Sequence, residues 1–243
     1  MTEAFYLTKY GLPDPAEVDN DVFTAAVWES WMVDVAGRIG GLRAASAAER
    51  LRSWLAPACE LAVVAGSLRR GKPRVKDIDL VVKPCPDGDL FSSDPNRPRL
   101  ADLLADAIAA GWLRQAGANG ERLKRLEIRS EVHYPGAATS APNYKTDVAW
   151  IKAELHIVRP PAQFGLVQLL RTGPAEYSQW IVTSKAQGGA LPGHVMIDQA
   201  ALWQRTDRGT PAVVIPTETE ADVCAALGID LVDPELRAPQ WKR

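Results

Sequence analysis

Residues 61–82 read LAVVAGSLRRGKPRVKDIDLVV and contain two short apolar runs separated by a glycine turn and a basic loop. The first run, 61–65, is rich in valine and is bounded by glycine, as is typical of a buried strand. The second run, 80–82, follows a pair of aspartates. This pattern predicts a strand, a tight turn, a basic loop and a second strand.

The aspartates are Asp77 and Asp79, at the start of the second predicted strand. Alternate residues of a strand share one face, so both carboxylates should point the same way, roughly 7 Å apart along the backbone. Ile78 and Leu80 should then point into a core. Two convergent carboxylates are suitable ligands for Mg²⁺, which prefers oxygen.

The turn and the loop between the strands suit an anionic ligand. Gly66 and Ser67 offer backbone N–H groups and a hydroxyl to phosphate. Arginine adds forked donors for the same anion. The loop holds five cations: Arg69, Arg70, Lys72, Arg74 and Lys76.

The whole spacing, G-S-x-x-R-x(6)-D-x-D between two apolar runs, resembles the signature of the polymerase-beta-type nucleotidyltransferases, and within them the DNA polymerase X family. The resemblance implies a palm fold, two Mg²⁺ ions (Mn²⁺ as a substitute) and transfer of a nucleoside monophosphate from a nucleoside triphosphate. At the matching positions, Asp77 and Asp79 would hold both metals. Ser67 and Arg70 would hold the β- and γ-phosphates, beside Gly66.

The resemblance also implies a third carboxylate on a neighbouring strand, and two residues compete for this role. Glu154, in AELHIVRPPAQFG, stands where the family has an aspartate, with one extra residue before Phe164. Asp147 fits the family's hairpin length better when counted from Gly120. Their odd separation puts them on opposite faces of a straight strand, so only one can serve. The resemblance favours Glu154 as the third metal ligand and leaves Asp147 as the alternative.

The stretch FGLVQLLRTGPAEYSQW, at 164–180, resembles the family's helix, T-G turn and following helix. Arg171, Thr172 and Gly173 are therefore expected to contact the nucleotide. Many family members have an aromatic pair before the T-G turn that senses the sugar, whereas this chain has Leu170 and Arg171. Strong discrimination against ribonucleotides is accordingly not expected.

The predicted fold class is α/β (α+β). A nucleotidyltransferase palm with a mixed sheet is expected at 58–172, preceded by a small helical segment at 1–57 and followed by a thumb-like domain at 173–243. The resemblance covers roughly residues 46–237. Within it, the G-S and D-x-D motif is the specific part.

Local signals predict the remaining elements. Two capping boxes, Ser46 with Glu49 and Thr217 with Glu220, predict helix starts. The other predicted elements are a helix from Asp21, a loop at 38–46, a helix at 100–112, strands within 122–129 and 144–158, a hairpin loop at 133–143, helices at 162–171 and 175–187, and two short strands within 194–205.

Composition sets limits on the possible functions. The chain has 243 residues, a net charge of −2 and a pI of about 6.0, so nucleic acid would have to bind to local basic patches such as 69–76. Cys59, Cys85 and Cys224 form no C-x-x-C motif and indicate free thiols in a reducing cytosol. Neither a signal peptide nor an apolar run of 18 residues is evident, so a cytoplasmic protein without a membrane role is expected.

The histidines do not form a metal-binding pattern by sequence. His133, His156 and His194 are scattered along the chain. His156 is expected to flank the site if Glu154 does.

The predicted function is that of a compact family X-like DNA polymerase that adds nucleotides to a DNA 3′-hydroxyl, in gap repair or end extension. One alternative is the same chemistry on RNA 3′ ends, protein or small-molecule hydroxyls. Another is an inactive nucleic-acid-binding module. Lys185 is the only Lys or Arg between 173 and 204, which weighs against a thumb that binds DNA.

Overall fold

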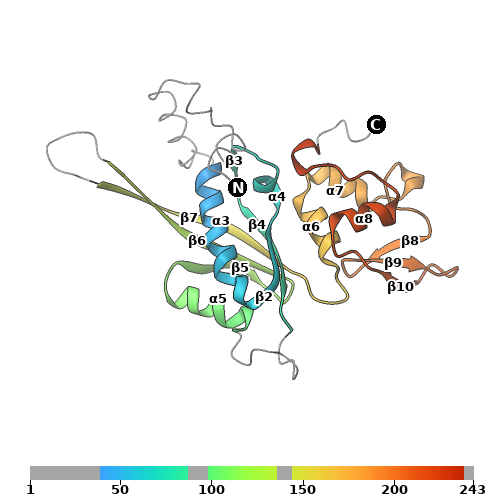
Figure 1. Cartoon of the computed structure of the whole chain (residues 1–243), viewed down its shortest axis with the longest axis horizontal. Coiled ribbons are helices and arrows are strands. Elements are labelled where there is room, and N and C mark those ends of the chain that lie inside the picture. Colours follow the sequence, from blue (N-terminus) through green and yellow to red (C-terminus); the bar gives the residue numbers. More distant parts are fainter. Residues whose placement is uncertain (1–38, 87–97, 136–143, 238–243) are drawn as a thin grey trace.

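The structure is a computed structural model that describes residues 39–86, 98–135 and 144–237, with the backbone alone at 132–135 and 144–147. Figure 1 shows two lobes, one built on a large twisted sheet and one on short helices and a small sheet. The helix predicted from Asp21 lies outside the described residues, as does most of the hairpin loop predicted at 133–143.

The larger lobe contains a five-stranded mixed sheet. Its spatial order is β2 (Cys59–Val64), β4 (Ile78–Pro84), β7 (Tyr144–Ile157), β6 (Leu123–Pro135) and β5 (Leu113–Asn119). β4 and β7 run parallel, whereas the other neighbouring pairs are antiparallel. The mixed sheet with helices confirms the predicted fold class.

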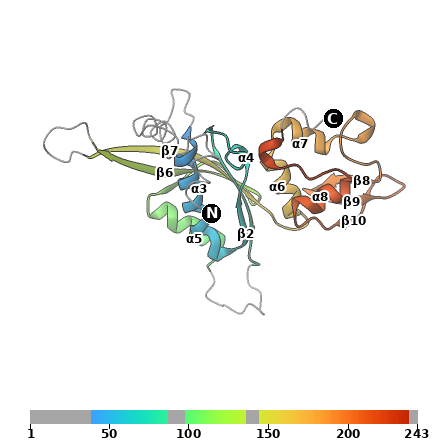
Figure 2. The ribbon, with the colours of Figure 1, turned by 45° about the horizontal axis from the view of Figure 1, so that its top comes forward.

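Helices α3 (Gly41–Leu55) and α5 (Leu100–Ala109) pack against one face of this sheet (Figure 2). On β4, Ile78 and Leu80 are fully buried in this core, as predicted. Leu155 on β7 joins them. The alternate residues of β4 and β7 therefore remain on the opposite face, which carries the charged groups described below.

The start of α3 differs from the prediction. The helix begins at Gly41, so Ser46 lies inside it and does not cap it, and the loop predicted at 38–46 is wrong. The two-residue strands β1 (Ile39–Gly40) and β3 (Arg74–Val75) pair just before the helix. This pairing holds the backbone in place directly before Gly41. The alanine-rich segment that follows favours a helix over a loop.

The smaller lobe has a separate buried core formed by helices and a three-stranded antiparallel sheet of order β10-β9-β8. The two short strands predicted within 194–205 are confirmed. The elements of this lobe are α6 (Phe164–Thr172), α7 (Ala175–Val182), β8 (Val195–Asp198), β9 (Ala201–Arg205), β10 (Pro211–Ile215) and α8 (Glu220–Leu227).

The capping box of α8 is displaced from the predicted one. Thr219 is the N-cap and exchanges hydrogen bonds with Asp222, so the predicted pair of Thr217 and Glu220 is wrong. Both pairs satisfy the sequence rule for a capping box. The Glu220 carboxylate is instead held by arginines from distant parts of the chain, which leaves Asp222 to complete the cap.

Helix α7 is shorter than predicted. It ends at Val182, and Thr183 is extended, with its carbonyl accepting a hydrogen bond from the Leu191 N–H. The rest of the predicted helix forms a single 3-10 turn. The structure contains three such turns in its described part: η1 (Ala56–Ala58), η2 (Lys185–Gln187) and η3 (Pro234–Leu236). Among the described helices, none has the length and hydropathy required to cross a bilayer.

Candidate functional site

The turn after β2 forms a short helix, α4 (Gly66–Arg69), which lies directly beside Asp79. Gly66 has a φ of +63°, a conformation that favours glycine, and a Cβ built there would lie 1.9 Å from the Asp79 carboxylate. The Ala65 N–H donates to the Asp79 carbonyl over 2.8 Å. Glycine at this position therefore allows the carboxylate to lie against the start of α4.

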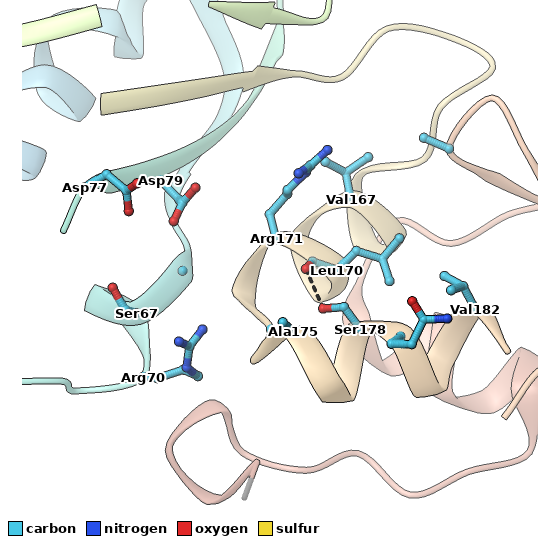
Figure 3. Close-up of a pocket in the computed structure, with 14 residues that line it drawn as sticks. Ser67, Arg70, Asp77, Asp79, Val167, Leu170, Arg171, Ala175, Ser178 and Val182 are labelled. Atoms are coloured by element: carbon cyan, nitrogen blue, oxygen red, sulfur yellow. Dashed lines mark hydrogen bonds between the residues drawn. The ribbon is translucent and has the colours of Figure 1, made fainter. Parts of the chain in front are cut away.

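A cavity of about 610 Å³ opens between the two lobes at this point. Figure 3 shows Asp77, Asp79, Ser67 and Arg70 on one side, with Leu170 and Arg171 on the other. Of the residues predicted to contact the nucleotide or metal, the cavity is lined by Gly66, Ser67, Arg70, Asp77, Asp79, Arg171 and Gly173. The structure thus brings together seven predicted site residues from segments about 90 positions apart.

The carboxylates at the site repel one another. Burial raises the pKa of Asp77, and the negative charges of Asp79 and Glu154 raise it further. Lys76 and Lys152 oppose this effect only in part. Such a cluster of incompletely compensated negative charge favours binding of a cation.

The pairing of β4 with β7 places Glu154 beside Asp79. The two residues are direct partners in the parallel ladder, so their side chains share a face. The backbone of Asp147 pairs with Val132, roughly 23 Å along β7 from Glu154 at about 3.3 Å per residue. Of the two candidates for the third acid, Glu154 is the one next to the aspartates.

The structure adds His156, which belongs to no metal-binding pattern in the sequence. His156 is 3% exposed, and its Nε2 lies 3.2 Å from Asp79 Oδ1 and 3.8 Å from Glu154 Oε2. One ligand atom from each of these three residues lies within 4.8 Å of the others. The signal available in the sequence was the separation of two between Glu154 and His156, which puts both on one strand face.

Glu154 also contacts a cation of the neighbouring strand. Arg125 of β6 donates its Nε–H to Glu154 Oε1 over 2.8 Å. Lys76 and Lys152 lie with Arg125 around a second cavity of about 300 Å³, which Asp77 also lines. Three cations therefore border the carboxylate cluster on the side of β6.

Adjacent arginines of the G-S motif have different surroundings. Arg70 lines the large cavity and donates to the carbonyl of Thr172, and burial lowers its pKa while the charge of Asp79 opposes that shift. Arg69 instead binds the Glu220 carboxylate through two hydrogen bonds of 2.6 and 2.8 Å, and donates to the Thr172 hydroxyl over 2.7 Å. The Thr172 side chain is fully buried in this contact.

Glu220 has a second arginine partner. Arg237 is 3% exposed and donates to Glu220 over 3.1 Å, while its guanidinium lies over the ring of Tyr177. The Arg69–Glu220–Arg237 cluster thereby ties α4 of the larger lobe to α8 and to the end of the described chain. Among the other cations of the basic loop, Lys72, Arg74 and Lys76 are exposed.

Comparison with known proteins gives a distant similarity. No model of a known protein family matches the chain. A curated protein, DNA polymerase lambda of Rattus norvegicus, is 29% identical over 185 residues, which cover 73% of this chain and 28% of that protein. The chain thus matches little more than a quarter of the relative's length. This weak homology suggests the polymerase-beta-type superfamily of nucleotidyltransferases.

Proposed function

We propose that this chain is a metal-dependent nucleotidyltransferase, related to the family X polymerases, that adds nucleotides to a DNA 3′-hydroxyl. The observation that carries the proposal is the cavity lined by Ser67 and Arg70 together with Asp77 and Asp79, with Glu154 on the strand adjacent to Asp79. Phosphate-binding groups and metal-binding carboxylates are there combined in one opening. The similarity to a DNA polymerase supports this reading of the cavity.

In this proposal the protein's task is alignment and charge compensation, because phosphoryl transfer leaves little covalent chemistry for side chains. Ser67 and Arg70 bind the β- and γ-phosphates of the triphosphate. Leu170, Arg171 and Gly173 form the facing wall and lie against the sugar. This arrangement holds the α-phosphate near Asp77 and Asp79, where an acceptor hydroxyl can attack in line.

The residues present fit a metal-binding role. Asp79, Glu154 and His156 supply ligand atoms within 4.8 Å of one another, and burial, with the charges of Asp79 and Glu154, raises the pKa of Asp77. We assign Asp77, Asp79 and Glu154 as metal ligands. Two divalent ions, when bound there, activate the hydroxyl and neutralise charge on the phosphates.

We also propose which parts of the chain form the palm and the thumb. Residues 58–172 form the palm and residues 173–243 the thumb-like part, after a helical N-terminal segment at 1–57. The described helix of that segment, α3, packs in the same core as the palm sheet. The acceptor's backbone phosphates would be bound by Lys76, Arg125 and Lys152, which border the carboxylates.

A second candidate is transfer to an RNA 3′ end, protein or small-molecule hydroxyl. The observation favouring it is the scarcity of cations in the smaller lobe, where Lys185 is the only Lys or Arg between 173 and 204. Leu170 on the sugar side of the cavity also lacks the aromatic edge that would exclude a 2′-hydroxyl.

The test is a transfer screen with the full chain. Each α-labelled NTP and dNTP is incubated with gapped DNA, single-stranded DNA or tRNA, in Mg²⁺ and separately in Mn²⁺. We expect labelled DNA and release of pyrophosphate. Label on tRNA alone would move the assignment to the second candidate. If protein that is folded and binds metal transfers label to no acceptor, the remaining alternative is an inactive nucleic-acid-binding module.

A further inference from the structure

We propose that Asp79, Glu154 and His156 form a mixed nitrogen and oxygen site that binds a first-row transition ion, Mn²⁺ or Co²⁺, in preference to Mg²⁺. The inference rests on the proposed function in that this ion would serve the same site. It goes further by naming the imidazole as a ligand and by reversing the expected metal preference.

The geometry suits a single ion. Ligand atoms that are each about 2.0–2.2 Å from one ion lie roughly 3 to 4.4 Å from one another. His156 Nε2 lies 3.2 Å from Asp79 Oδ1 and 3.8 Å from Glu154 Oε2. All three ligand atoms lie within 4.8 Å of one another, so small side-chain rotations suffice to close the site.

The backbone holds these ligands in place. Asp79 and Glu154 are partners in the β4–β7 ladder, and His156 follows Glu154 on the same face of β7. The His156 side chain is 4% exposed, against 19% for Asp79 and 26% for Glu154. The imidazole therefore lies beneath the carboxylates, with its Nε2 directed at them and little access to water.

Arg125 sets the orientation of Glu154. Its Nε–H donates to Oε1 over 2.8 Å, while Oε2 is the oxygen nearest His156. The ion pair also offsets part of the negative charge on Glu154. The attraction of this site for a cation then depends less on charge alone and more on the nitrogen donor.

The donor set decides which ion is preferred. Mg²⁺ binds oxygen ligands and dehydrates reluctantly, so an imidazole contributes little to its binding. Affinity of a nitrogen and oxygen site for divalent first-row ions rises from Mn²⁺ through Co²⁺, and a nitrogen donor suits the transition metals of this series better than it suits Mg²⁺. A buried histidine facing two carboxylates thus favours a transition ion.

The test is direct binding of Mn²⁺ to the full chain without nucleotide, followed by electron paramagnetic resonance and by competition with Mg²⁺. We expect Mn²⁺ to bind at least about tenfold more tightly than Mg²⁺. In His156→Gln, Mn²⁺ affinity should fall by at least about tenfold, since loss of even an outer-shell partner of a metal ligand costs about 10–100-fold. Mg²⁺ affinity should change by less than about threefold.

His194→Gln is the matched control, because His194 is exposed and lies outside the cluster. It should bind Mn²⁺ as the unaltered chain does. His156→Asp supplies a third carboxylate, and its preference should shift toward Mg²⁺. Thermal melting of each variant without metal verifies that the fold is kept. If His156→Gln melts at a lower temperature than the unaltered chain, two other measurements replace it. These are the metal preference of His156→Asp and the Co²⁺ absorption spectrum of the unaltered chain, which reports nitrogen ligation.

Two outcomes would overturn the proposal. One is equal affinity for Mn²⁺ and Mg²⁺ in the unaltered chain. The other is unchanged Mn²⁺ binding in a folded His156→Gln protein, which would make His156 a hydrogen-bond partner of Asp79 and nothing more. Because these measurements contain no nucleotide, their failure is separate from that of the proposed function. Transfer without Mn²⁺ preference overturns only this inference, and Mn²⁺ binding without transfer overturns only the proposed function.

Discussion

Two clusters of charged residues flank α4, and they differ in how far their charges are compensated. On one side, Asp77, Asp79 and Glu154 converge beside an open cavity, and burial together with the charges of Asp79 and Glu154 raises the pKa of Asp77. On the other side, Arg69 and Arg237 enclose Glu220, which is 7% exposed.

The difference separates two uses of charge. A buried charge with complete partners holds parts of a fold together, and removing one partner is costly because another charge is left unpaired. A group of like charges at a cavity is unfavourable by itself and becomes favourable when a ligand of opposite sign binds. We therefore assign the first cluster to function and the second to the connection between the lobes.

The largest expected effect concerns the carboxylate cluster. Asp77→Asn should lower the rate of nucleotidyl transfer by about a thousandfold, because a lost metal ligand removes several kcal/mol of charge stabilisation. Without metal, the free energy of unfolding at neutral pH should be unchanged or higher, since the substitution removes repulsion with Asp79 and Glu154. Transfer rates and urea unfolding measure the two effects. Full activity in this variant would contradict the metal assignment.

The opposite cluster should show the reverse pattern. Glu220→Ala should lower the free energy of unfolding by about 3–5 kcal/mol, because Arg69 and Arg237 lose their shared partner. Glu218→Ala is the control: Glu218 is exposed and pairs with Lys83 at 3.6 Å, so its loss should cost about 0–1 kcal/mol. Equal urea midpoints for the two variants would show that the buried cluster does not join the lobes.

The next prediction concerns Arg70, which lines the cavity on the side of the carboxylates. Arg70→Ala should raise the KM for triphosphate by roughly 10- to 150-fold, since a charge-assisted hydrogen bond contributes about 1.5–3 kcal/mol. Lys72→Ala, in the same loop but exposed, should leave this KM nearly unchanged. Steady-state kinetics with varied triphosphate and varied acceptor decide the role. A change confined to the acceptor's KM would assign Arg70 to the acceptor.

The smallest expected effect concerns the sugar side of the cavity. An adaptable apolar wall discriminates one hydroxyl by only about 1–3 kcal/mol, so dNTP should be preferred over rNTP by no more than roughly a hundredfold in kcat/KM. Leu170→Tyr should widen that gap by crowding the 2′ position, whereas Leu170→Met, which conserves volume, should not. A preference of many thousandfold in the unaltered chain would show that another group excludes ribose.

The G-S and D-x-D stretch predicted the central strands and the placement of Ile78 and Leu80, because period-two alternation and a glycine turn are local signals. The choice between Glu154 and Asp147 was beyond local pattern. It depends on the register of β7 against β4, which places Glu154 beside Asp79. Which residue of β7 lies opposite Asp79 is a long-range property that the alternation within one strand does not give.

The other wrong or incomplete predictions also depend on contacts between residues far apart in the sequence. The sequence grouped Arg69 with the loop cations, yet its partner Glu220 lies 151 residues away. That contact also takes Glu220 out of the predicted capping box and leaves the cap to Thr219 and Asp222. His156 shared a strand face with Glu154, but only the paired strands show that its Nε2 is directed at Asp79.

The most direct test of the central claim compares one reaction in two proteins. A 5′-labelled gapped DNA is incubated with dNTPs and divalent metal, with the unaltered chain and with the double variant Asp77→Asn and Asp79→Asn. We predict metal-dependent 3′ extension with one pyrophosphate released per nucleotide by the unaltered chain, and none by a double variant that melts no lower in the absence of metal. Extension by the folded double variant would contradict the assignment of these carboxylates to nucleotidyl transfer.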